Sequence, residues 1–325
     1  KNNENNENNE NNKDIIEKYS VSNILYFNTT FRSYINPIIN QPLSDSDFNL
    51  PVQINNISEI KLASICIKKP YLISSSKNNN KFIIRKYNSS NSEYGNLTIT
   101  FSNGYYDTYD ELSDYLNDNY FYNSTTSDKF FSSLTFSIDK NSKHSKFDIC
   151  YTTISGDSDN KDFNYYVIDF NTHYIEHYSL GKILGFKENS IIDSKDSTNT
   201  PETNTTIISL YCSKIVDSTP LFFCFNEFAQ NIIETHKIIL KENLSTFKIL
   251  AKLNPQLANK DNNYYINETF SKRNRIDNIR KYSGFINLDR FNIKIIDFFG
   301  NIINNDINDD IIFSLEVIIN NLRII

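Results

Sequence analysis

Tryptophan and methionine are absent from the 325-residue sequence, and glycine and proline are scarce, with seven of each. Because no methionine occurs, we expect residue 1 to lie downstream of the translated start. With so few glycines and prolines, clusters of Asn, Asp and Ser have to mark most of the turns. The sequence shows such clusters between short apolar runs, a texture that is typical of β-proteins.

Histidine is also rare, which disfavours metal sites with several histidine ligands. The sequence has four: His144, His173, His177 and His236. None forms the H-x-H pair that a cupin-type metalloenzyme carries on a strand. His173 and His177 have the spacing of ligands on one face of a helix, but the order "HYIEH" differs from the zinc-protease order "HExxH" and no third ligand is nearby. We therefore expect no metal site and no cofactor.

Cysteines and charges exclude further classes. The cysteines, Cys66, Cys150, Cys212 and Cys224, have no close paired spacing, so neither a zinc ribbon nor a disulfide framework is expected, and most should be small buried side chains. A net charge of −6 and a pI near 5.4 argue against direct nucleic-acid binding. The basic stretch at 271–281 is interpreted as a solvated loop. No apolar run of about 18 residues and no signal peptide is found, so we expect no membrane span and synthesis in the cytosol.

Aromatic residues are abundant, with 21 tyrosines and 24 phenylalanines, and they favour pleated, half-buried surfaces. Two helices are expected: residues 108–121, where Thr108 and Glu111 have capping-box spacing, and a short one that a glycine ends near 186. The expected strands lie at 56–67, 80–87, 96–104, within 132–153, at 163–170, 207–215, 220–228, 245–254, within 283–303 and at 310–319. Eight to eleven strands without alternating long helices predict an antiparallel jelly-roll sandwich, single rather than double, with one or two short inserted helices.

The chain ends of this domain are predicted from composition. The triplet repeat "KNNENNENNENNKD" has no apolar residue, so residues 1–23 are expected to be an Asn-rich arm, ordered only in an assembled particle. Residues 24–325 are expected to form the jelly-roll domain, with a polar insertion around 187–206. The sequence leaves open whether that insertion is a loop or a divider between two jelly rolls.

The stretch "SLGKILGF" at 179–186 places Gly181 and Gly185 four residues apart. It lacks the spacing of a phosphate-binding loop. We interpret it as a helix end that packs tightly on a sheet, with Phe186 among its buried residues.

Several segments together resemble the minor capsid or penton-type jelly-roll proteins of large nucleocytoplasmic DNA viruses. The segments are "FRSYINP" (31–37), "DSDFNLP" (45–51) leading into an Asn-Asn-Ile run at Asn55 and Asn56, "SLGKILGF" with Gly181, Gly185 and Phe186, "KILAKL" (248–253), "RKYSGFINLDRFNIKIIDFFGNII" (280–303) with Tyr282, Gly284 and Gly300, and "DIIFSLEVII" (310–319). They run from about residue 26 to the end. Gly284 departs from the family pattern because Phe-Ile follows it in place of Pro-Val.

The resemblance implies a structural protein of the virion, either the vertex (penton) unit or a minor capsid component. Its partners would be further copies of itself, as a homopentamer, together with the major capsid protein and other minor capsid proteins. The alternative is a jelly-roll binding module that recognises a glycan or a host or fibre protein. An enzyme is the least favoured reading, because no nucleophile, metal or acid–base motif was found.

Overall fold

Almost all regular structure in the computed structural model is antiparallel β-sheet. The structure describes residues 16–32, 44–88, 90–121, 134–149, 163–170, 179–187, 191–193, 205–214, 219–233, 247–255, 261, 264–270, 278–303 and 310–324. Within these ranges every strand pairing is antiparallel, and two short α-helices are present. The predicted all-β class with short inserted helices is confirmed.

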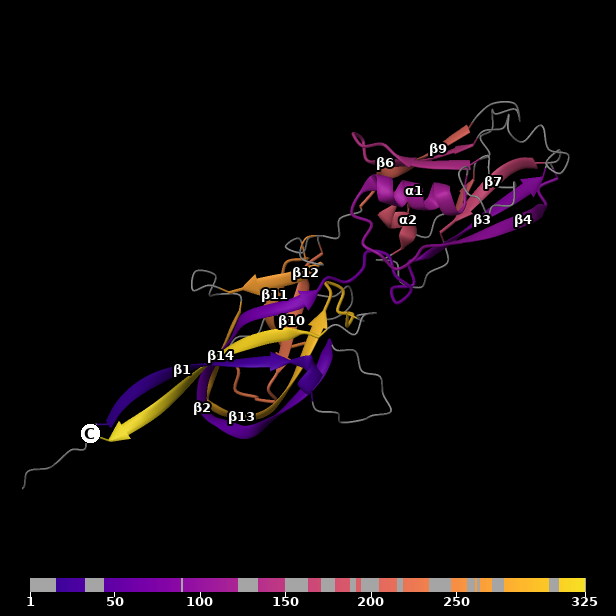
Figure 1. The fold of residues 1–325 in the computed structure, drawn as a ribbon. Helices are drawn as coiled ribbons and strands as arrows, with labels where there is room; N and C mark the ends of the chain where they lie inside the picture. The colour runs from indigo at the N-terminus through magenta and orange to yellow at the C-terminus, as the bar shows by residue number, and fades with distance from the viewer. Residues whose placement is uncertain are drawn as a thin grey trace, which may run out of the picture. The chain divides into compact units, whose positions relative to one another are not determined.

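The chain folds into two compact units, and the second is inserted into the first (Figure 1). Unit 1 comprises Lys1–Pro70 and Ser218–Ile325, and unit 2 comprises Tyr71–Asp217. This differs from the single domain expected over residues 24–325. The chain crosses between the units at Pro70–Tyr71 and at Asp217–Ser218, and residues 215–218 lie outside the described residues. The polar stretch 187–206 lies inside unit 2, so it does not divide the chain; residues 188–190 and 194–204 lie outside the described residues.

Unit 1 is built on one curled sheet of seven strands. Its strands are β1 (Ile16–Asn28), β2 (Asp45–Lys68), β10 (Leu221–Asn226), β11 (Ile249–Leu253), β12 (Tyr265–Thr269), β13 (Ile279–Ile296) and β14 (Ile312–Ile324), with a 3₁₀ turn η1 at Thr29–Phe31. The order is β1-β14-β2-β13-β10-β11, and β12 pairs with β2. Strand β2 therefore pairs with three strands that lie more than 190 residues further along the chain.

Phenylalanine rings fill the core of unit 1. Phe27, Phe48, Phe291 and Phe313 stand within 6.4 Å of one another by ring centroids, in both stacked and edge-on contacts. They come from β1, β2, β13 and β14, so the sheet has to curl for one cluster to form. Buried aromatic pairs add roughly 0.5–1.5 kcal/mol each beyond their burial.

The last part of the arm predicted at residues 1–23 is a strand in the structure. Residues 16–23 belong to β1, which pairs with β14 in unbroken register from Ile16 opposite Ile324 to Asn28 opposite Ile312. Figure 1 shows these two strands running on together toward the C-terminus as a two-stranded ribbon. Residues 1–15 lie outside the described residues. The alternating apolar positions that follow Ile16 were the missed signal for this strand.

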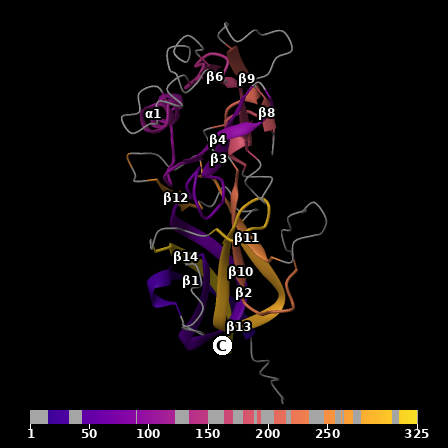
Figure 2. The same cartoon turned by 90° about the vertical axis from the view of Figure 1, so that its right-hand side faces the viewer.

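Unit 2 is a sandwich of two sheets with two helices (Figures 1 and 2). Its elements are β3 (Lys81–Asn88), β4 (Glu93–Thr100), α1 (Tyr109–Asn119), β5 (Leu134–Ile138), β6 (His144–Ile149), β7 (Phe163–Asp169), α2 (Leu180–Ile183), β8 (Ile191–Asp193) and β9 (Thr205–Cys212). One sheet has the order β4-β3-β7-β8 and the other β5-β6-β9. Phe82 of the first sheet and Phe147 of the second lie 6.3 Å apart by ring centroids in one shared core.

Helix α1 forms where the sequence predicts it. The Thr108 hydroxyl accepts a hydrogen bond from the Glu111 N–H, and the Glu111 carboxylate accepts one from the Asp107 N–H, which satisfies donors that a helix start leaves unpaired. Further along, the Asn117 amide bonds both the carbonyl and the N–H of Phe136, each at 2.8 Å. The helix is thereby held to β5.

The two glycines of "SLGKILGF" allow different close contacts. Gly185 ends α2 with φ +82°, and a Cβ there would overlap the Tyr211 carbonyl oxygen on β9. Gly181 has ordinary backbone angles, but a Cβ would lie 3.0 Å from the ring of Phe170. Phe186 is buried and stacks on Phe170 at 5.3 Å. The structure contains the close helix–sheet packing inferred from the sequence at these positions. The helix was expected within 172–186, and residues 172–178 lie outside the described residues.

We expect Gly185→Ala to destabilise the protein by more than about 1–3 kcal/mol, the usual cost of a strained backbone, because steric overlap adds to it. Gly284→Ala is the matched control, since its nearest atom would be 3.7 Å from the new Cβ. Urea unfolding followed by circular dichroism measures both. Equal midpoints for the two variants would contradict the packing role of Gly185.

Candidate functional site

The segments that resemble capsid proteins fall mainly on the central strands of unit 1. Tyr282 and Gly284 lie on β13, and Gly300 follows it in a turn with φ +85°. Asn55 and Asn56 are exposed where β2 bends, and Asn56 has φ +60°. Its N–H donates to the Asn287 side chain of β13 at 3.3 Å. The structure thus brings Asn56 and the Tyr282–Gly284 region to one pair of strands, while Gly181, Gly185 and Phe186 lie in unit 2.

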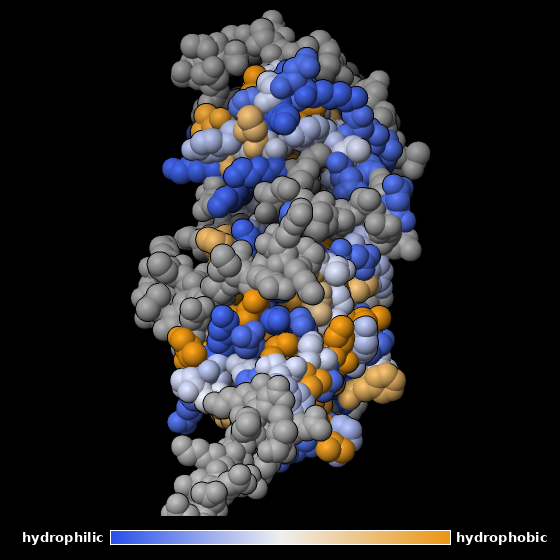
Figure 3. All heavy atoms as spheres, turned by 90° about the vertical axis from the view of Figure 1, so that its left-hand side faces the viewer, coloured by the Kyte–Doolittle hydropathy of each residue, from blue (hydrophilic) through white to orange (hydrophobic). Residues whose placement is uncertain are grey.

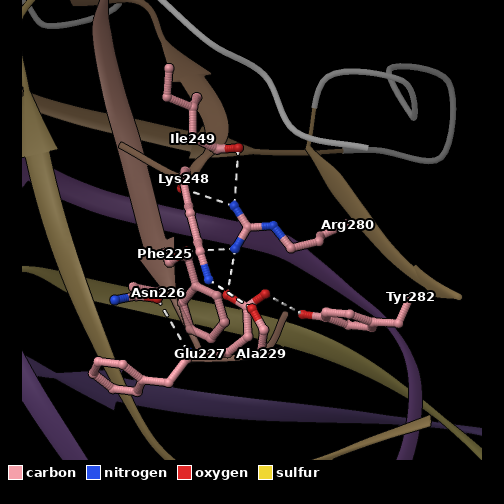
Figure 4. A network of polar contacts seen from close by, with 9 residues as sticks. Phe225, Asn226, Glu227, Ala229, Lys248, Ile249, Arg280 and Tyr282 are labelled. Carbon is pink, nitrogen blue, oxygen red and sulfur yellow. Dashed lines mark hydrogen bonds and ion pairs between the residues drawn. The ribbon is translucent and has the colours of Figure 1, made fainter. Parts of the chain in front are cut away.

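A buried ion pair lies inside unit 1, centred on Arg280 (Figure 4). Arg280 of β13 is 1% exposed and its Nη1 lies 2.5 Å from Oε2 of Glu227, which directly follows β10. The guanidinium also donates to the carbonyl oxygens of Phe225, Lys248 and Ile249. Removing two charges from water costs free energy unless the buried donors find acceptors. Here four oxygen atoms accept hydrogen bonds from the two Nη groups.

Tyr282 completes this network. It lies two residues from Arg280 and therefore on the same face of β13. Its hydroxyl donates to Oε1 of Glu227 at 3.1 Å, as Figure 4 shows. Burial, reinforced by the Glu227 carboxylate, raises the pKa of Tyr282 well above its usual range. The phenol is consequently a permanent hydrogen-bond donor to Glu227.

The network ties β13 to β10 and β11 where the pairing of β10 with β11 ends. The last bond between them runs from the Phe225 N–H to the Lys248 carbonyl, just before β11 begins. The Arg280 guanidinium then binds carbonyls from both sides of that junction. The Lys248 ammonium adds a bond to the Ala229 carbonyl at 2.9 Å. These contacts shape unit 1 and provide no open reactive group.

Arg280 lies within the basic stretch 271–281 that was interpreted as a solvated loop. Residues 271–277 lie outside the described residues, but Arg280 is buried and Lys281 is on β13. The interpretation was wrong for these last residues. No local sequence signal placed Arg280 inside, because its burial depends on Glu227, 53 positions away in the sequence.

Exposed apolar side chains gather at one end of unit 1. A row of paired residues crosses four strands: Val21 of β1, Ile319 of β14, Ile57 of β2 and Ile286 of β13. Tyr19, Val21, Val52 and Phe285 lie at or beyond this row and are exposed. We call these four residues the apolar end of unit 1.

Further along β1, two more apolar side chains, Ile24 and Tyr26, are exposed on the outer face of the strand, and Tyr26 is 77% exposed. In unit 2, Ile208, Leu210 and Tyr211 are exposed on β9. Figure 3 shows apolar side chains in orange spread among polar ones in blue over one face of the molecule. Each unit thus exposes apolar side chains on a strand at the margin of a sheet, as surfaces that contact other proteins do.

In the part of the chain that the structure describes, no group of three or more His, Cys, Asp and Glu residues is arranged to hold a metal. His173, His177 and His236 fall outside that part, and the His144 ring bonds the Ser209 carbonyl at 2.7 Å. None of the described helices is long and apolar enough to cross a membrane.

The cysteines differ in burial. Cys224 is buried, and burial raises its pKa to about 12. Cys66 is half-buried, and burial raises its pKa as well. Cys212 is exposed, and Cys150 lies outside the described residues. The prediction of small buried side chains is confirmed for Cys224 and wrong for Cys212.

We expect Arg280→Ala to destabilise unit 1 by about 3–5 kcal/mol, because the Glu227 carboxylate would stay buried without its cation. Arg290→Ala is the control: this arginine is exposed on the same strand and stacks on Phe228 at 4.9 Å, so its loss should cost about 1 kcal/mol or less. Denaturant unfolding compares the two variants. Adding Glu227→Gln to Arg280→Ala should recover part of the loss, and a larger loss in the double variant would contradict the pairing.

The buried thiol gives a second prediction. With a pKa of about 12, Cys224 should be roughly one part in ten thousand thiolate at pH 8, and the thiolate is the reactive form. Brief alkylation of the folded protein at pH 8 should label Cys212 and spare Cys224, and both should react in denaturant. Peptide mass spectrometry reads the result, with Cys212→Ser as control. Equal labelling in the folded state would show that Cys224 is accessible.

Comparisons with known proteins were made by sequence and by structure. No family model matches the chain, and no curated protein matches it significantly. Among solved structures it is similar to the crystal structure of the mavirus penton protein, with a TM-score of 0.41 and 11% sequence identity over 93% of this chain and 99% of that chain. It is also similar to a chain of the cryo-EM structure of the Sputnik virophage, with a TM-score of 0.42 and 12% identity over 92% of this chain and 97% of that chain.

Proposed function

We propose that this protein is a structural component of a virion, placed at the vertex as a penton or among the minor capsid proteins of a large icosahedral DNA virus. The observation that carries the proposal is the placement of the capsid-like segments. The most specific of them, 248–253, 280–303 and 310–319, contain β11, most of β13 and the first part of β14, which all belong to the sheet of unit 1. Strand β13 contributes Phe285 to the apolar end, and β13 and β14 both belong to the sheet that presents it.

Physical reasoning supports a role in assembly. Shell proteins make the same contacts many times over, so they need rigid frames and side chains that bury area at small entropy cost. The phenylalanine cluster and the Arg280 network supply a frame in unit 1. Tyr19, Tyr26 and Phe285 are exposed aromatic side chains of the kind that interfaces enrich.

The proposed partners follow from that role. They are further copies of the chain, as a homopentamer where it occupies the vertex, the major capsid protein and other minor capsid proteins. The net charge of −6 disfavours direct contact with nucleic acid. The protein would be made in the host cytoplasm, reside in the capsid, need no cofactor and catalyse no reaction.

Purified particles test the proposal. We expect mass spectrometry to find the chain at a fixed copy number relative to the major capsid protein, and icosahedral cryo-EM to place both units in density at the vertex or beneath the shell. Antibodies against the chain, applied to intact and disrupted particles, provide the control for adsorbed protein. Absence from washed particles would exclude the structural role. Binding of the isolated chain to a glycan or fibre protein, in the absence of particle association, would favour the alternative.

A further inference from the structure

Strand β1 presents a long edge without the usual protection against pairing. It bonds β14 on one side along all 13 residues, and among the described residues no strand pairs with its other side. From Tyr19 to Asn28 it contains no charged residue and no proline. Natural edge strands carry charges, prolines or bulges, because an open row of N–H and C=O groups templates further pairing. The edge of β1 is therefore built to accept another strand.

The two faces of β1 differ in pattern. Leu25 and Phe27 pack against the core of unit 1, so the residues of the same parity, Tyr19, Val21 and Asn23, share that inner face. Their β14 partners agree: Asn23 lies opposite Val317 and Val21 opposite Ile319, which also belong to the core side. The inner face thus reads aromatic, aliphatic, Asn, aliphatic, aromatic, and it is symmetric about Asn23.

We infer that the partner of this edge is β1 of a second copy of the chain, paired antiparallel about a twofold axis at Asn23. Tyr19 then lies opposite the partner's Phe27, and Val21 opposite the partner's Leu25. A twofold axis perpendicular to the sheet keeps the inner faces on the same side, as this matching requires. Tyr19 and Val21, which are 45% and 36% exposed in the single chain, are covered, and so are the open sides of Leu25 and Phe27.

Only this register places aromatic opposite aromatic, aliphatic opposite aliphatic and Asn opposite Asn on the inner face. A slip by two residues in either direction puts Asn23 opposite Val21 or Leu25, which sets an amide against an aliphatic side chain. The positions of the charged residues are also compatible with this pairing. Glu17 and Lys18 fall outside the paired stretch Tyr19–Phe27, and the nearest charged residue on β14, Glu316, is already bonded to Ser22 at 2.8 Å and to Lys61 at 3.5 Å. No like charges meet across the contact.

This contact goes beyond the proposed function. A twofold contact cannot close a ring of five, so it belongs to the free protein, where it covers an edge that would otherwise invite disordered association. The pairing can fail while the chain still proves to be a virion component, because particle composition is measured independently.

Disulfide trapping tests the register in the full-length chain. Asn23→Cys places two thiols directly opposite each other across the axis, within the Cα separation that a disulfide spans. Ser22→Cys is the control: its two copies lie diagonally, about 7–8 Å apart, beyond easy bridging. Mild oxidation should give a covalent dimer of Asn23→Cys at least tenfold faster than of Ser22→Cys. A mixture of Ser22→Cys and Ile24→Cys should form the mixed dimer, and the unsubstituted chain oxidised in parallel reports its own cysteines.

Sedimentation equilibrium provides a second, independent test of the dimer. The unsubstituted chain should sediment at twice its 37.9 kDa mass at micromolar concentration, and Asn23→Lys, which opposes two like charges at the axis, should sediment as a monomer. Circular dichroism checks that Asn23→Lys retains the fold, as an exposed position should. A monomeric unsubstituted chain, or equal crosslinking of Asn23→Cys and Ser22→Cys, would overturn the inference.

Discussion

The length of strand β2 is the constraint on which unit 1 depends. Its 24 residues pair with β14 on one side and with β13 and β12 on the other, so strands from the last third of the chain take their register from it. Such pairings bring together residues more than 190 positions apart and have a large loop-closure cost. The compensation is one phenylalanine cluster shared by four strands. Register shifts in β2 and β13 allow the sheet to curl around that cluster.

The same curl explains why an arginine and a glutamate are buried in this core. Where β10 and β11 part, backbone carbonyls point into the interior of unit 1, and a buried backbone group that stays unpaired costs free energy. The Arg280 guanidinium supplies donors to carbonyls of both segments, and Glu227 balances its charge. Tyr282 then satisfies the second carboxylate oxygen. The ion pair is a consequence of the sheet geometry, and its contribution is to specify where the strands separate.

Rigidity inside unit 1 contrasts with what it presents outside. The row from Val21 to Ile286 continues the core out to exposed side chains, and the edge of β1 extends the sheet to an unprotected margin. In unit 2, the exposed Ile208 and Leu210 of β9 alternate with buried Ile207 and Ser209 and lie on the opposite face. The proposed role in a shell would require this combination, because shell contacts must be repeated with the same geometry in every copy.

Local patterns in the sequence determined much of the secondary structure and some of the packing. Alternating apolar residues located β3, β7, β10 and β14, the Thr108–Glu111 spacing located α1, and the glycine pair located a close helix–sheet contact, because each of these depends on neighbours within a few residues. Only the tertiary structure decided the rest. The insertion of unit 2 into unit 1, the pairing of residues 16–23 with β14 and the burial of Arg280 all depend on partners more than 50 residues away, and no local propensity encodes which distant strand will lie alongside.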